Sequence, residues 1–229
     1  VPSAGALYPT EIYAVCRGLA DIEDGLYHVS PLEHGLRGLR RGDLLPAAGE
    51  VLRLQGRGIP HLVVFLAAIL FRSAWKYRDR SYRYHLLDTG HVLESLALAL
   101  HVMGLSGNVF LDFDDKAAEG FLGLDPRREV ALAAVTLFEG IEDQAPSKGA
   151  PGDLSGLPPA ILEASRVSER EQDYPAIHTI HAAGMKMPDA AADSEECMVE
   201  HLDMSPDTWI PIRPSQSWPE DRPYPETLF

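Results

Sequence analysis

The alternation of hydrophobic and polar residues changes near residue 141. Upstream of it, apolar runs alternate with turn residues, which is typical of a folded domain. Downstream lie two proline-rich stretches with little periodicity, residues 142–159 and 213–229. The first is typical of a linker that leaves a domain, and the second of an extended arm or a disordered end. The pattern therefore predicts a domain over residues 1–140 and a proline-rich linker or tail over residues 141–229.

Several short segments of the first part have the hydrophobic pattern of β-strands. Residues 11–18 alternate between apolar and polar positions. Residues 25–45 read as a short strand, a turn and a second strand or loop. The apolar run His61–Leu70 is rich in β-branched residues at its start and fits a strand buried on both faces. Two further strands are expected over residues 108–113 and 128–140.

Two segments of the first part are typical of helices. The stronger is Tyr84–Leu105, where leucine, valine and methionine recur at helical spacing. The shorter covers residues 114–125, with Asp114 or Asp115 as its cap. Because these helices interleave with the strands, we expect a layered domain of the α+β or α/β class.

Composition and charge narrow the class of protein. The chain has 229 residues and a formal net charge of −14, which argues against a general nucleic-acid binder. Its longest apolar run is shorter than the roughly 20 residues that cross a bilayer, so no membrane segment is expected. Cys16 and Cys197 lie far apart in sequence and are interpreted as two reduced thiols. We expect a cytoplasmic protein without a secretory signal.

The first candidate binding segment is "PSAGALYP", residues 2–9. The small residues Ser3, Ala4 and Gly5 let the backbone approach a flat ligand closely. Ser3 can also cap a following helix, whose free N–H groups would face a negative group. A plain turn before a strand explains the same proline and glycine residues, so both interpretations stay open.

The second candidate segment runs from Phe71 to His91. Lysine and arginine side chains alternate there with aromatic ones, in a chain that is acidic as a whole. Such a segment suggests an anionic ligand, or a lysine and a tyrosine placed for proton transfer. The alternative is a solvated basic loop in which the aromatic side chains cover apolar surface.

Histidines provide a weaker set of candidates. His91 follows Asp88 by three residues on the predicted long helix, where a histidine is more often structural than a base. His178 and His181 form an HxxH pattern, and further metal-ligand types follow at Glu195, Glu196, Cys197 and His201. Their spacing matches no compact metal motif. No Walker loop, GxGxxG or GxSxG motif is present.

Four segments together resemble one family. "PSAGALYPTEIYAV", "GLYHVSPLEHGL", "FRSAWKYRDRSYRYHLLDTGHVLESLALALHVMGL" and "FDDKAAEGFLGLDPRREVALAAVTLFEG" occur in the order and spacing of SagB-type dehydrogenases. These form the azoline-oxidising branch of the FMN-dependent nitroreductase family, and the resemblance covers residues 2–140. It implies an α+β fold with a central, mostly antiparallel sheet flanked by helices. It also implies an intimate dimer with FMN at the interface.

The resemblance also implies roles for individual residues. Lys76 and Tyr77 match the pair that azoline dehydrogenases use when they remove a proton from carbon, so they are the expected catalytic residues. The implied partners are a second copy or a related nitroreductase-like domain, and the implied substrate is a small molecule or a peptide. The residues expected to bind FMN are Pro2, Ser3, Ala4, Gly5, Leu7, Tyr8, Arg80 and Arg83.

Two departures from the family pattern leave an alternative open. The Arg-x-Ser-x-Arg element that holds the FMN phosphate is not in this sequence, so we expect the domain to lack its N-terminal part and to bind FMN weakly. Leu111 and Asp112 stand where many nitroreductases have a Gly-Gly pair. The alternative function is a non-catalytic pairing module that has lost its flavin.

The tail carries one more predicted element. "VSEREQDYPAIHTIHAAG", residues 167–184, loosely resembles a segment that joins two nitroreductase-like domains in tandem members of the family. A helix is expected there over about residues 173–183, with Pro175 in its first turn. The tail would then lead to a second domain.

Overall fold

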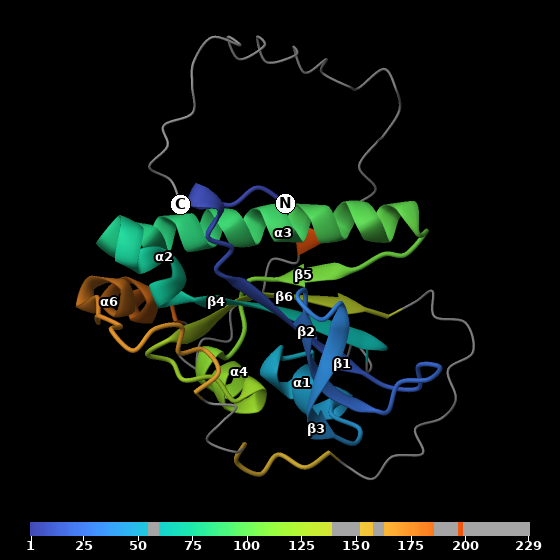
Figure 1. Cartoon of the computed structure of the whole chain (residues 1–229). Coiled ribbons are helices and arrows are strands. Elements are labelled where there is room, and N and C mark those ends of the chain that lie inside the picture. Colours follow the sequence, from blue (N-terminus) through green and yellow to red (C-terminus); the bar gives the residue numbers. More distant parts are fainter. Residues whose placement is uncertain (55–59, 139–151, 158–162, 186–196, 199–229) are drawn as a thin grey trace, which may run out of the picture. The chain divides into compact units, whose positions relative to one another are not determined.

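A single antiparallel sheet organises the computed structural model, which describes residues 1–54, 60–138, 152–157, 163–185 and 197–198 (Figure 1). The strand order is β3-β2-β1-β4-β6-β5-β7, and every neighbouring pair is antiparallel. This arrangement confirms the expected α+β class. The strands are β1 (Thr10–Cys16), β2 (Gly25–Ser30), β3 (Gly35–Arg41), β4 (Leu62–Ile69), β5 (Asn108–Phe110), β6 (Glu129–Leu137) and β7 (Cys197–Met198).

The two middle strands β4 and β6 are buried on both faces, as the continuous apolar run of β4 predicts. Phe65 of β4 is fully buried on one face and Leu66 on the other. Alternate side chains of a strand point to opposite faces, so one strand supplies both layers of the core. Because β4 pairs with β1 on one side and β6 on the other, it fixes the positions of both neighbours.

Helices cover the two faces of the sheet unequally (Figure 1). The long helix α3 (Ser81–Val102) lies along one face, while α1 (Leu45–Val51) and α4 (Asp115–Leu122) lie on the other. α4 begins as expected, because the Asp114 carboxylate accepts a hydrogen bond from the Ala117 N–H at 2.9 Å. The sequence pattern did not predict α1.

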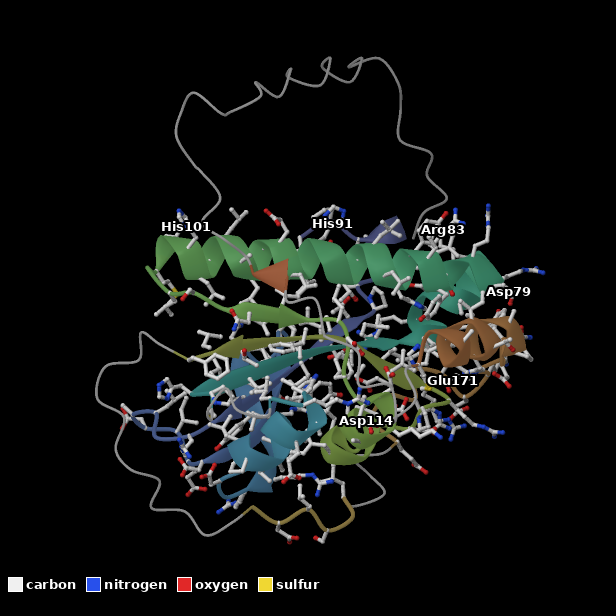
Figure 2. All side chains as sticks on the ribbon, turned by 180° about the vertical axis from the view of Figure 1, so that it is seen from behind. Asp79, Arg83, His91, His101, Asp114 and Glu171 are labelled. Atoms are coloured by element: carbon white, nitrogen blue, oxygen red, sulfur yellow. The ribbon has the colours of Figure 1, made fainter. Side chains whose placement is uncertain are left out.

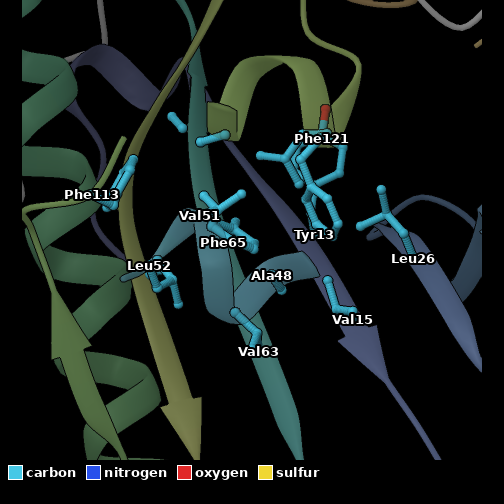
Figure 3. Close-up of a cluster of buried hydrophobic side chains, with 14 of the residues drawn as sticks. Tyr13, Val15, Leu26, Ala48, Val51, Leu52, Val63, Phe65, Phe113 and Phe121 are labelled. Carbon is cyan, nitrogen blue, oxygen red and sulfur yellow. The ribbon is translucent and has the colours of Figure 1, made fainter. Parts of the chain in front are cut away.

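The core on the α1 and α4 side is rich in aromatic residues (Figure 3). The Phe65 ring lies 6.4 Å from Phe113, edge to face, and 6.0 Å from Phe121. Such ring pairs contribute beyond the area that they bury. A second, aliphatic cluster lies between the sheet and α3, where Leu93 and Leu96 pack against buried residues of β4 and β6.

The basic and aromatic segment after β4 is helical rather than a loop. It forms α2 (Leu70–Tyr77), the short 3₁₀ helix η2 (Arg78–Arg80) and the first turns of α3. Arg78 has a positive φ of 54°, so the helical direction breaks at that residue. The solvated basic loop considered from sequence is therefore wrong. Its composition hid a helix because the buried residues, Leu70, Ser73 and Ala74, include only one large apolar side chain.

The described parts of the tail pack against the first 140 residues. The predicted tail helix is confirmed as α6 (Pro175–Gly184), with proline in its first turn. Its Ile177 is 1% exposed and lies in a cluster with Leu70, Ala74 and Val130. Nearer the linker, the buried guanidinium of Arg40 donates to the backbone carbonyls of four residues, namely Gly120, Phe121, Asp153 and Ser155. The domain boundary at residue 140 stays a prediction.

Candidate functional site

A buried aspartate of α3 anchors the N-terminal loop, residues 2–8. Asp88 is 4% exposed, and its two carboxylate oxygens accept from the Ser3 hydroxyl at 2.6 Å and the Ala4 N–H at 3.1 Å. The Ser3 hydroxyl in turn accepts from the Tyr8 N–H at 2.9 Å. Charge-assisted hydrogen bonds of this kind are strong, particularly away from water. The loop that follows Ser3 is therefore held in one place against α3.

Gly5 brings this loop into contact with the expected catalytic pair. It lies in the short 3₁₀ helix η1 (Ala4–Ala6) with a φ of +66°. A Cβ atom at this position would lie 2.6 Å from the Tyr77 hydroxyl oxygen and 2.7 Å from Lys76 Nζ. Only glycine therefore fits without displacing one of those side chains. Residues more than 70 positions apart in sequence thus meet in one site.

The lysine and the tyrosine sit at the C-terminal end of α2 with their polar ends together. Lys76 Nζ lies 5.4 Å from the centroid of the Tyr77 ring, and the Tyr77 ring lies 4.6 Å from that of Tyr84. Lys76 is exposed and Tyr77 is half-buried. An ammonium and a phenol beside an open loop can orient a substrate or exchange a proton with it.

A buried histidine lies next to the anchoring aspartate. His85 is fully buried, and burial lowers its pKa to about 4 even though the nearby Asp88 carboxylate raises it. The imidazole is therefore neutral near pH 7, and it does not neutralise Asp88 by ion pairing. The Asp88 carboxylate stays available to the Ser3 hydroxyl and the Ala4 N–H.

The remaining expected FMN-binding residues fall into two groups. Pro2, Leu7 and Tyr8 belong to the anchored loop, and Arg72 Nη1 donates to the Tyr8 carbonyl at 2.9 Å. The second group, Arg80 and Arg83, is exposed. Figure 2 shows Arg83, with His91, on the side of α3 that points away from the sheet. Among the described residues, no hydrogen bond or ion pair joins Arg80 or Arg83 to the loop, so their role stays a prediction.

The alternative metal site is not formed by the two candidate histidines that the structure describes, His178 and His181. His178 contacts Asp173 at 2.7 Å, and His181 Nδ1 lies 3.0 Å from the Tyr82 hydroxyl. The part of the chain that the structure describes holds no group of three or more ligand residues that could bind a metal ion. Glu195, Glu196 and His201 lie outside the described residues, as does the side chain of Cys197.

Asp88 is the residue of the candidate site that sequence reasoning missed. It was noted only as a neighbour of His91, which proves to be exposed. A signal was present, because an aspartate in the middle of an apolar helix needs a partner when it is buried. The identity of that partner, 85 residues away in sequence, was not available from local pattern. Leu111, one of the two residues that depart from the family pattern described above, follows β5, and its side chain is 68% exposed.

Comparisons with known proteins agree with this fold. A family model described as "Nitroreductase family" matches residues 1–140. The microcin B17-processing protein McbC of Escherichia coli is 30% identical over 152 residues, which are 62% of this chain and 54% of that protein. The trifolitoxin-processing protein TfxB of Rhizobium leguminosarum bv. trifolii is 34% identical over 141 residues, covering 58% of this chain and 38% of that protein.

Solved structures show the same architecture. A putative nitroreductase from Anabaena variabilis matches with a TM-score of 0.62 and 27% identity, covering 83% of this chain and 38% of that one. A chain of the E. coli microcin synthetase McbBCD complex, solved with truncated pro-MccB17 bound, matches with a TM-score of 0.54 and 26% identity. That match covers 62% of this chain and 55% of the other. The chain thus spans about half or less of the length of these relatives.

The part of the chain that the structure describes contains no helix long and apolar enough to cross a membrane.

Proposed function

The chain belongs to the nitroreductase family, and from this premise we propose that it is an FMN-dependent oxidoreductase domain that converts azoline rings of a ribosomally made peptide into azoles. Reduction of nitro or quinone compounds is the broader form of the same proposal. The observation that carries it is the contact of Gly5 with Lys76 and Tyr77, because it joins the loop and the pair expected from the family in one site.

The relatives support a peptide as the substrate. McbC and TfxB are each named for the processing of a peptide product, microcin B17 and trifolitoxin. The McbBCD complex was solved with truncated pro-MccB17 bound. A similar role for this chain would require partners that present the peptide to it. We therefore include other protein subunits among its proposed partners.

The residues of the loop fit a flat cofactor. Ser3 and Ala4 are fixed by Asp88, while Gly5 and Ala6 are exposed and have little side-chain bulk. The backbone there is open to the edge of an isoalloxazine ring, and the exposed Arg80 and Arg83 would meet the phosphate. FMN bound at this loop would supply the two-electron acceptor for oxidation of the substrate. Lys76 as the neutral amine, or Tyr77 as the phenolate, would take the proton that leaves the substrate carbon.

A spectroscopic and chemical assay tests the proposed function. The purified chain is expected to bind added FMN weakly, and the change in flavin fluorescence during titration with the chain measures that binding. With an azoline-containing peptide, mass spectrometry should then detect loss of two hydrogen atoms per ring. A chain that binds no FMN even at high flavin concentration and forms no azole would contradict the enzyme and favour the non-catalytic pairing module. The replacement of a Gly-Gly pair by Leu111 and Asp112 is the observation that favours that alternative.

We also propose that the outer side of α3 forms a subunit interface. Leu86 and Leu87 are 48% and 55% exposed on this helix, close to the anchored loop, and exposed neighbouring apolar residues are typical of interfaces. A copy of the chain, or a related nitroreductase-like domain, would cover them. Sedimentation at micromolar concentration should show a dimer, which Leu87→Glu should dissociate without unfolding the chain. A wild-type chain that sediments as a folded monomer would contradict pairing between copies.

A further inference from the structure

A second site lies on the α1 and α4 side of the sheet, where Arg72, one of its lining residues, also contacts the Tyr8 carbonyl of the N-terminal loop. Its cavity has a volume of about 400 Å³, which is within the range of small-molecule pockets. Its floor is formed by side chains of the sheet and its wall by the end of α4, with Ala164 and Ser165 of the tail. The apolar part of the lining is formed by Leu39, Ile69, Leu122 and Leu124.

The polar end of this cavity contains charged side chains that pair with one another. Glu11 contacts His28 Nε2 at 2.6 Å through one oxygen and Arg72 Nη1 through the other. Burial acts to raise the pKa of Glu11, but the contacts with His28 and Arg72 together hold it below its usual value. The negative charge of Glu11 is therefore already compensated. Arg37, at the rim, pairs with Glu33.

Glu129 differs from Glu11, because among the described residues no basic side chain pairs with it. It is 4% exposed, and its Oε1 accepts from the Tyr13 hydroxyl at 2.7 Å. Among the described residues, no basic side chain forms a salt bridge with it, whereas Arg72 and His28 both pair with Glu11. Burial raises the pKa of Glu129 to about 7, and the Tyr13 hydrogen bond only partly offsets that effect. A buried carboxyl group in this state gains stability from a cation.

We propose that this cavity binds a small organic cation, a primary ammonium on a short apolar chain, with the ammonium at Glu129 and the chain along Leu39 and Leu122. The ammonium would supply the positive charge that Glu129 lacks. It would also donate hydrogen bonds to the carboxylate, and such charge-assisted bonds are among the stronger polar contacts. The apolar remainder of the ligand would leave water for the aliphatic side of the cavity. This site does not depend on the proposed oxidoreductase function.

Proton release accompanies binding, because the cation favours the ionised carboxyl. Because burial raises the pKa of Glu129 to about 7, part of the Glu129 carboxyl groups carry a proton near pH 7 in the free chain. Affinity for the ammonium should therefore rise from pH 6 to pH 8. The groups that face Glu129 are Tyr13, Glu11, His28 and Arg72. The Glu129→Gln variant described below shows whether Glu129 is the source of this pH dependence.

The test measures binding of n-butylammonium to the full chain by calorimetry, with n-butanol and butyrate as neutral and anionic counterparts. We expect n-butylammonium to bind, and the other two to bind at least about tenfold more weakly, since one charged contact is worth about that factor. Glu129→Gln keeps the shape of the side chain and removes its charge. It should weaken ammonium binding by at least about tenfold and abolish the proton release.

A matched control is available in Glu119, because its pKa is also raised to about 7 by burial, yet it does not line the cavity. Glu119→Gln should leave the affinity for n-butylammonium unchanged. Circular dichroism melts of both variants check that the fold persists. The proposal is overturned if no ammonium binds, if n-butanol or butyrate binds as well as the ammonium, or if Glu129→Gln binds it as tightly as the unmodified chain does.

Discussion

Replacing Lys76 with alanine is expected to lower azole formation by about 10²- to 10⁴-fold, the contribution typical of one general base. Tyr77→Phe should have an effect of similar size if the phenol transfers the proton, and a smaller one if it only orients Lys76. Both polar groups lie against Gly5, so the site that they form is built on the anchored loop. Single-turnover rates measured with an azoline peptide and saturating FMN give the comparison.

Flavin content and a surface lysine provide the controls for that experiment. Both variants should keep the flavin absorbance of the unmodified chain, because Asp88 rather than Lys76 anchors the loop. Lys116 is also exposed, lies on α4 at the other face of the sheet, and should give unchanged rates when replaced with alanine. Normal azole formation by both Lys76→Ala and Tyr77→Phe would remove the proposed catalytic pair.

Replacing Ile177 with alanine is expected to destabilise the chain by about 2–5 kcal/mol, the cost of truncating a large buried aliphatic side chain. Ile177 is 1% exposed and packs against Leu70 and Ala74 of α2 and Val130 of β6. Because α2 carries the proposed catalytic pair, Lys76 and Tyr77, at its C-terminal end, loss of this contact should also lower activity. Denaturant unfolding monitored by circular dichroism measures the change in free energy.

The same helix contains its own control. Ile180 is 51% exposed, so Ile180→Ala removes the same atoms from the surface and should change the free energy of unfolding by less than about 0.5 kcal/mol. Equal stability of the two variants would mean that α6 does not contribute to the core around α2. The tail would then be a separable appendage, as the proline-rich sequence suggested.

The sequence was most informative where burial and periodicity agree. β4 and α3 follow from their apolar patterns, and the cap of α4 follows from an aspartate at the right position. α1 and α2 were missed for a physical reason. Both are short, and α2 is largely polar on its exposed side. The contacts that stabilise them therefore come from elements elsewhere in the chain, mainly α4 for α1 and mainly α3, α6 and β6 for α2, rather than from local propensity.

The residues of the candidate site also fall into those that the sequence predicted and those that it did not. Lys76 and Tyr77 were identified by resemblance, and the small residues of the loop by their chemistry. Asp88 and the cavity around Glu129 were not found, because their partners lie far away along the chain. Glu129 and Tyr13 are 116 residues apart and meet only through the pairing of β1, β4 and β6. No local pattern in a single sequence encodes such a pairing.

The strand order has a consequence for how the chain folds during synthesis. β1 and β6 both pair with β4, so the middle of the sheet joins residues 10–16 with residues 129–137. Strands β1 to β4 can pair as soon as β4 has emerged, while the other edge of β4 stays unpaired until β6, about 60 residues later, leaves the ribosome. Nonlocal pairing of this kind slows folding and exposes unpaired strand edges meanwhile. We therefore expect the nascent chain to depend on chaperones until β6 has emerged.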